Sequence, residues 1–124
     1  MKIDRRRFTR FDTYAKAYLP GDSTPYEVTN ISYKGCFIAT SQKIDRGKLL
    51  FFEVELPYIG RVPIYGVVVH HGTPEKPGLG IEIIEIDHDL TPVWVLFIKA
   101  MGYIEEAKKI YDQTMKQLKE KGNL

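Results

Sequence analysis

The sequence has little of what would place it in a specialised class of protein. Its single cysteine, Cys36, excludes an internal disulfide framework and is compatible with a reducing compartment. The apolar run 93–98 stops at Lys99 and is far shorter than the ~20 residues that cross a bilayer, so we expect no membrane insertion. No apolar segment with a small-residue cleavage site follows the basic N-terminus, and we therefore expect a cytoplasmic location.

Signatures of catalysis and of metal binding are also missing. The sequence contains no phosphate-cradling P-loop, no dinucleotide-binding fingerprint and no nucleophile elbow. His70 and His71 are adjacent on an expected strand and should point to opposite faces. No cysteine or carboxylate completes a metal-ligand spacing with them or with His88. We therefore expect a protein that is not an enzyme and that carries no metal and no cofactor.

The charge is small overall but unevenly distributed. The 124 residues are 44% hydrophobic and 27% charged, which is typical of one ordinary globular domain with its own core. The formal net charge is +2, too small for DNA binding driven by many phosphate contacts, and we expect no specific DNA binding. Residues 1–20, however, contain six Lys or Arg and two Asp. This local charge of +4 is suited to attracting an anion to one end of the domain.

Short β-strands separated by turn residues fill most of the chain. Alternating apolar residues predict the strands, and turn dipeptides such as Pro20–Gly21 predict the turns at which the chain reverses between them. Six strands are expected, over residues 13–19, 26–31, 36–40, 48–56, 61–71 and 79–86. This number of short strands predicts a small barrel or a closed sandwich.

The last third of the chain has a different period. Thr91 and Pro92 predict a helix start, with Thr91 as the N-cap and Pro92 in the first helical position. Apolar residues follow at helical spacing from Val93 to Leu118. We expect this helix to close an open end of the barrel; the alternative is that its outer turns pair with a second subunit or with a partner protein.

Arginines are concentrated at the N-terminus, at Arg5, Arg6, Arg7 and Arg10. The flat guanidinium group can stack on an aromatic base, and its fork donates two parallel hydrogen bonds to a phosphate or to guanine. A cluster of arginines therefore suggests a nucleotide ligand as well as a negative charge.

A second polar element lies between the second and third expected strands, at residues 30–35. Asn30 can donate and accept hydrogen bonds, and Ser32 can donate to a phosphate or base oxygen. Gly35 has no side chain, which permits a left-handed turn or the close approach of a ligand. These residues could instead serve only the turn itself.

Together the two elements resemble those of the PilZ family of bacterial cyclic di-GMP receptors. Arg6 to Arg10 form an RxxxR element, and Asn30 to Gly35 form a (D/N)xSxxG element. The segment Gly78-Leu79-Gly80-Ile81-Glu82-Ile83 is similar to the glycine-bracketed late strand of that family. The resemblance covers roughly residues 4–100 and implies a mainly β fold, a six-stranded antiparallel barrel with a C-terminal α-helix.

The resemblance also implies the ligand and the residues that hold it. Cyclic di-GMP would be bound by Arg6 and Arg10 from one side and by Asn30, Ser32 and Gly35 from the other. Arg5, directly before the RxxxR element, would stack on a second, intercalated ligand molecule, or would be a surface charge. Residues 1–12 would form a flexible ligand-binding arm, 13–103 the barrel with the start of the helix, and 104–124 a helical extension.

The expected function is that of a receptor or adaptor. Ligand binding would order the arm, and the signal would pass to a partner protein or act through self-association as a homodimer. Motility, surface polysaccharide and biofilm formation are the processes that the family implies. Two alternatives stay open: a PilZ-like interaction module that binds no nucleotide, and a small barrel that binds single-stranded nucleic acid. The second requires aromatic stacking platforms along a longer basic track, for which Phe8 and Tyr33 give little support.

Overall fold

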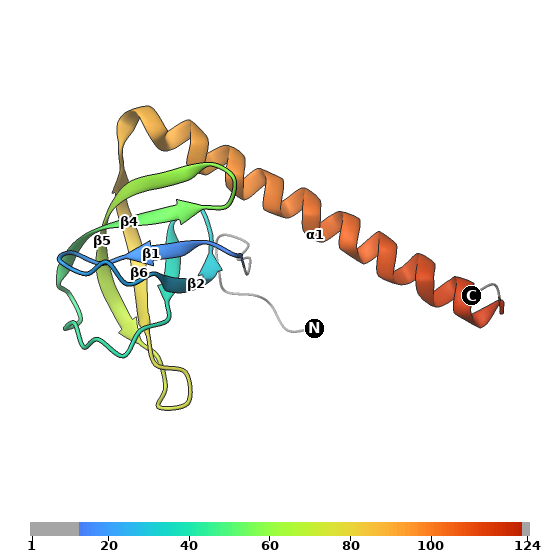
Figure 1. Ribbon diagram of the computed structural model, residues 1–124, viewed down its shortest axis with the longest axis horizontal. Helices are drawn as coiled ribbons and strands as arrows, with labels where there is room; N and C mark the ends of the chain where they lie inside the picture. Colours follow the sequence, from blue (N-terminus) through green and yellow to red (C-terminus); the bar gives the residue numbers. More distant parts are fainter. Residues whose placement is uncertain (1–12, 123–124) are drawn as a thin grey trace.

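A computed structural model of the chain describes residues 13–122. Six antiparallel strands form a closed barrel, and one long helix extends from it (Figure 1). This confirms the expected fold. The strands are β1 Lys16–Tyr18, β2 Tyr26–Ile31, β3 Gly35–Ile38, β4 Leu49–Leu56, β5 Gly60–His71 and β6 Leu79–Ile86.

The order of strands around the barrel is β1-β2-β3-β6-β5-β4, with β1 pairing to β4 to close it. Strands β3 and β5 are therefore not neighbours, because β6 lies between them. Closure removes the unpaired sheet edges at which other chains could add.

Alternation along each strand builds the core. In β4 the buried residues are Leu50, Phe52, Val54 and Leu56, and the residues between them face solvent or are half-buried. The same period of two runs along β5, so both strands contribute one apolar face to the barrel interior. Strand β1 is shorter than the expected 13–19, since only Lys16–Tyr18 join the ladders.

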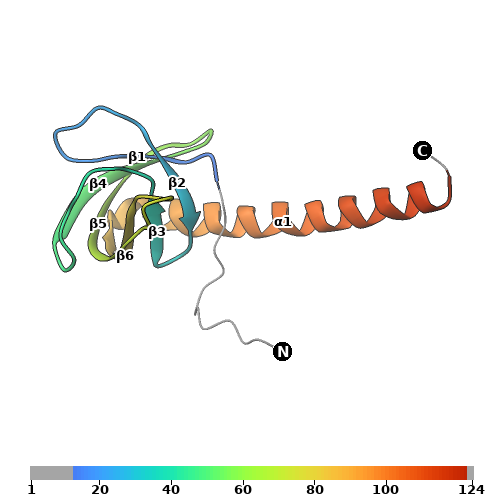
Figure 2. The ribbon, with the colours of Figure 1, turned by 90° about the horizontal axis from the view of Figure 1, so that it is seen from below.

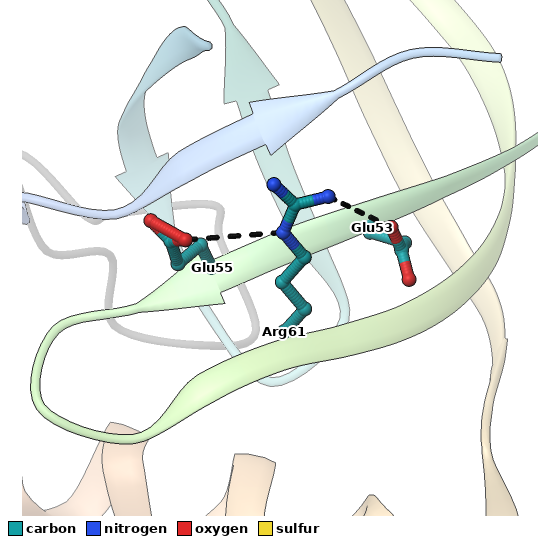
Figure 3. Close-up of polar contacts among 3 residues, drawn as sticks. All are labelled: Glu53, Glu55 and Arg61. Carbon is teal, nitrogen blue, oxygen red and sulfur yellow. Dashed lines mark hydrogen bonds and ion pairs between the residues drawn. The ribbon is translucent and has the colours of Figure 1, made fainter. Parts of the chain in front are cut away.

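An arginine ties three strands together on the outside of the barrel. The guanidinium of Arg61 on β5 lies 3.4 Å from the carboxylate of Glu53 and 3.8 Å from that of Glu55, both on β4 (Figure 3). The same group lies 3.7 Å above the ring centre of Tyr18 on β1. All four residues are at least partly exposed, so these contacts add little to stability but help to fix the register of β1, β4 and β5.

The helix begins differently from the sequence prediction. A 3₁₀ turn, η1 His88–Leu90, precedes α1 Thr91–Glu120. The carboxylate of Asp87 accepts a hydrogen bond from the Asp89 amide and caps η1. Thr91 is already helical, and its hydroxyl donates to the Asp87 carbonyl at 3.2 Å. The N-cap assignment of Thr91 was therefore wrong, because the turn that Asp87 caps places Leu90 in that position without a side-chain cap.

Only the first turns of α1 pack on the barrel. Trp94, Phe97 and Ile98 are buried and belong to the hydrophobic core. The helix then continues without interruption through Gly102 and leaves the barrel (Figures 1 and 2). Within residues 13–122 no helix is both long enough and apolar enough to span a membrane.

Candidate functional site

A pocket of about 980 Å³ lies on the outer surface of the barrel. Its walls come from β2, β3, the end of β5 and the loops that follow β3 and β5. This volume is at the upper end of the range for small-molecule sites, which is roughly 300–1,000 Å³. The lining residues include Thr13, Asn30, Phe37, His70, Thr73 and Lys76.

Four residues on four neighbouring strands form a lateral row, and three of them, Asn30, Phe37 and His70, line the pocket. Asn30 on β2 pairs with Phe37 on β3, and Phe37 pairs with Gly80 on β6. Gly80 in turn pairs with His70 on β5. We call Asn30, Phe37, Gly80 and His70 the lateral row. It places an amide at one end and two aromatic rings beside it.

The two rings meet over a glycine. The ring centres of Phe37 and His70 are 6.2 Å apart and the ring planes differ by 23°. A Cβ atom added to Gly80 would overlap the His70 ring, and one added to Gly78 would overlap the Phe37 ring. The absence of a side chain at both glycines therefore leaves the space in which the rings lie, and this explains why glycine occupies both positions of Gly78-Leu79-Gly80.

Irregular strand pairing occurs at both ends of the row. The register shifts between Val28 and Asn30 on β2 and again between Val68 and His70 on β5. Such bulges bend a strand locally and re-aim the next side chain. The two polar ends of the row, Asn30 and His70, each directly follow one of these shifts.

The β2–β3 turn holds the other two described residues of the predicted motif. Ser32 is buried, and both its amide, at 2.9 Å, and its hydroxyl, at 3.4 Å, donate to the Gly35 carbonyl. Gly35 begins β3 and pairs with Glu82. Of the two roles that the sequence left open for it, the left-handed turn does not occur, because the strand pairing requires an extended residue there. The structure thus places Asn30 in the pocket lining, whereas Ser32 and Gly35 shape the turn behind it.

A hydrogen-bonded cluster fastens the pocket rim. The Tyr26 hydroxyl donates to the Asp22 carboxylate at 2.6 Å, and the Gln42 amide donates to the same carboxylate at 2.6 Å. The hydrogen bond from Tyr26 and then those from Thr24 hold the pKa of Asp22 below its ordinary value. The ionised carboxylate joins the β1–β2 loop to the β3–β4 loop, and Tyr26 lines the pocket.

The histidines have separate roles at this site. His71 Nε2 lies 2.6 Å from the Ile44 carbonyl and so carries the proton that ties the β3–β4 loop to the end of β5. His70 instead presents its ring to Phe37. We expected these adjacent histidines to point to opposite faces of the strand. Both are nevertheless exposed and line the same pocket, because β5 ends at the barrel rim. In the part of the chain that the structure describes, no cluster of three His, Cys, Asp or Glu could hold a metal ion.

The predicted arginines, Arg5, Arg6 and Arg10, lie outside the described residues, as does the whole of the expected arm 1–12. Thr13, the first described residue, lines the pocket together with Asn30. Lys76, on the loop after β5, adds a positive charge to the lining.

Sequence comparison decides the family. Residues 4–91 match the PilZ domain family. The chain belongs to the PilZ domain family. A comparison with curated proteins gives no match.

Solved PilZ-containing structures share this fold. The structure of Bacillus subtilis Inhibitor of motility (MotI/DgrA) superposes with a TM-score of 0.70 at 19% identity, covering 87% of this chain and 54% of that chain. Escherichia coli YcgR in complex with c-di-GMP gives a TM-score of 0.66 at 14% identity, covering 90% and 51%. The PilZ domain of YcgR with c-di-GMP gives 0.63 at 14% identity, covering 88% and 98%. The chain thus spans about half the length of MotI/DgrA and of the longer YcgR chain.

Sequence reasoning missed Phe37, Gly80 and His70 as members of one site. Their signal in the sequence is weak, because 33 positions separate Phe37 from His70. Only the insertion of β6 between β3 and β5 brings the two rings together. The useful clue was the pair of glycines that bracket Leu79, which indicates backbone approached closely by large side chains.

Proposed function

We propose that this PilZ domain is a non-enzymatic receptor that binds cyclic di-GMP in the pocket over the lateral row. Its support is the family, the c-di-GMP complexes among structures of the same fold, and a pocket chemistry that suits a guanine dinucleotide. The observation that carries the proposal is that Thr13 and Asn30 line the same pocket.

Chain connectivity is the reason why this observation supports the proposal. An extended chain advances at most ~3.6 Å per residue, so the Cα of Arg10 lies within about 11 Å of that of Thr13. The long arginine side chain adds to this reach. The same limit for Arg6 is about 25 Å. Chain connectivity therefore allows both parts of the predicted motif to act on one ligand in the pocket that Asn30 lines.

Each part of the pocket suits a different part of the ligand. The Phe37 and His70 rings offer a surface for a guanine face, and base–aromatic stacking contributes about 1–3 kcal/mol per base. The Asn30 amide can both donate to and accept from a base edge. Arg6, Arg10 and Lys76 would neutralise the phosphates, with Arg5 able to stack on a second ligand. Ser32 and Gly35 fix the turn that carries Asn30.

Ligand binding would order the arm and so change the surface that the protein exposes. Fixing the backbone of one residue costs about 1–2 kcal/mol, and contacts to the ligand would offset that cost for residues 4–12. The altered surface would be read by a partner protein or by a second copy of the chain. Control of motility or biofilm formation is the corresponding cellular role in this proposal.

Calorimetric titration with cyclic di-GMP tests the proposal, with GTP and a short single-stranded oligonucleotide as competing ligands. We expect selective binding at micromolar or lower Kd. Asn30→Ala should weaken binding, whereas Gln117→Ala, an exposed amide on the distant helix, should leave it unchanged. Preference for the oligonucleotide would favour the nucleic-acid alternative, and no binding would favour an interaction module. Equal amide-exchange protection of residues 4–12 with and without ligand would refute ordering of the arm.

A further inference from the structure

The outer part of α1, residues 103–120, has no partner among the described residues. It stands away from the barrel in both views (Figures 1 and 2). At 1.5 Å per residue its length is about 27 Å. None of its side chains is buried, and Tyr103, Ile104, Ile110 and Tyr111 are between 57% and 76% exposed. A helix in a globular protein gains most of its stability from packing an apolar face against other residues, and the exposed apolar residues of 103–120 lack such packing.

The exposed face repeats every seven residues. Leu96, Tyr103 and Ile110 form one row of large residues, and Ile104, Tyr111 and Leu118 form a second. Small residues lie between the rows, at Ala100, Ala107 and Thr114. A sustained period of seven is the pattern of a helix that packs along another helix, because it keeps one seam facing the partner.

We propose that this face binds the same face of a second copy of the chain in antiparallel orientation. In one register Ala107 lies opposite the partner's Ile110, and Thr114 lies opposite the partner's Tyr103. The two-fold axis repeats both contacts, so a small residue meets a large one at each of these four layers. This is the self-complementarity that a symmetric dimer requires.

Charged residues beside the seam select this orientation. In the same register Lys99 lies opposite the partner's Glu120, and Glu106 lies opposite the partner's Gln113. A parallel pair would instead place Glu106 against the partner's Tyr111 and Lys99 against the partner's Ile104, with no opposite charge in reach. The antiparallel pair therefore gains two ion pairs that the parallel pair lacks.

The available area is sufficient for a dimer of moderate strength. The exposed tyrosines, isoleucines and Leu96 of two chains present on the order of 1,000 Å² of side-chain surface. Specific interfaces begin near this size, so we expect a dissociation constant in the micromolar range. The pocket lies at the start of β6 and the helix follows its end, so pairing leaves both pockets open. The inference does not depend on the nucleotide.

Analytical ultracentrifugation of the full chain tests the pairing without ligand. We expect a monomer–dimer equilibrium, and Ile110→Glu should weaken it about a hundredfold or more by burying a charge. A monomer at concentrations up to about 500 μM would overturn the proposal. Circular dichroism and thermal unfolding of each variant check that the helix persists and that the barrel is intact.

A charge exchange tests the orientation. Lys99→Glu should weaken association roughly three- to tenfold, and Lys99→Glu combined with Glu120→Lys should restore it. Lys116→Glu changes the same charge on the opposite side of the helix and should have a smaller effect. Failure of the double variant to recover would overturn the antiparallel register, and a larger assembly that tolerates Ile110→Glu would overturn the proposed face.

Discussion

Replacing His70 by alanine removes one of the two rings of the lateral row and leaves the remainder of the pocket in place. His70 is exposed, and its Nδ1 makes only a long contact of 3.4 Å to the His71 carbonyl, so the fold depends little on this ring. A surface change of this kind alters the free energy of unfolding by about 0.5 kcal/mol or less. Its loss from a base-stacking surface should cost about 1–3 kcal/mol of binding, a 5- to 150-fold increase in Kd.

The measurement is calorimetric titration of each variant with cyclic di-GMP, together with thermal unfolding. His88→Ala is the matched control, since this exposed histidine lies in η1, beyond the far end of β6 from the pocket. His70→Phe should retain most of the affinity because it keeps a ring at that position. If His70→Ala binds as tightly as His88→Ala, the ring pair has no part in ligand binding, and the stacking argument is refuted.

Four further changes probe other parts of the structure. Gly80→Ala should displace the His70 ring and lower ligand affinity with only a modest change in Tm; unchanged affinity would contradict the steric argument. Trp94→Ala should destabilise the barrel by about 3–5 kcal/mol in urea unfolding, and a cost below about 1 kcal/mol would mean that the helix does not close the core. Arg61→Ala should cost about 1 kcal/mol, with a larger loss indicating a role beyond these exposed contacts. The pKa of Asp22 is lowered in the folded protein, so the ionised carboxylate stabilises the fold at pH values above the ordinary pKa of 3.8, and this stabilisation is lost as the pH falls through the folded pKa. Asp22→Asn should remove this part of the acid dependence of Tm, and an unaltered pH profile of Tm would argue against the role of Asp22.

Most of the fold could be predicted from the sequence, because the signals are local. The bounds of β2 and β6 agree with the expected strands, since turn residues flank an alternating apolar pattern on both sides. Strand β1 was predicted too long because Ala15 and Leu19, which flank Lys16–Tyr18, are buried in the core like Ala17 and so continue the alternation. An alternating apolar pattern indicates which residues are buried, but it does not indicate how many of them pair with a neighbouring strand.

The site could be predicted only in part. Asn30 was identifiable because it belongs to a contiguous motif. The ring pair was not, since it depends on β6 lying between β3 and β5, a non-local arrangement that leaves no regular spacing in the sequence. The helix shows the same limit: its period predicts one apolar face along its whole length, whereas the division into a start that belongs to the barrel and an extension from residue 104 came from the resemblance to the PilZ family.

The projecting helix changes how the molecule moves through solution. Thirty residues of helix have a length of about 45 Å, much of it beyond the barrel, so even a single chain diffuses as an elongated particle. Such a particle has a high frictional ratio and elutes early from a gel-filtration column calibrated with spherical proteins. An early elution volume would therefore mimic a dimer, and the mass of this protein must be taken from light scattering or sedimentation equilibrium.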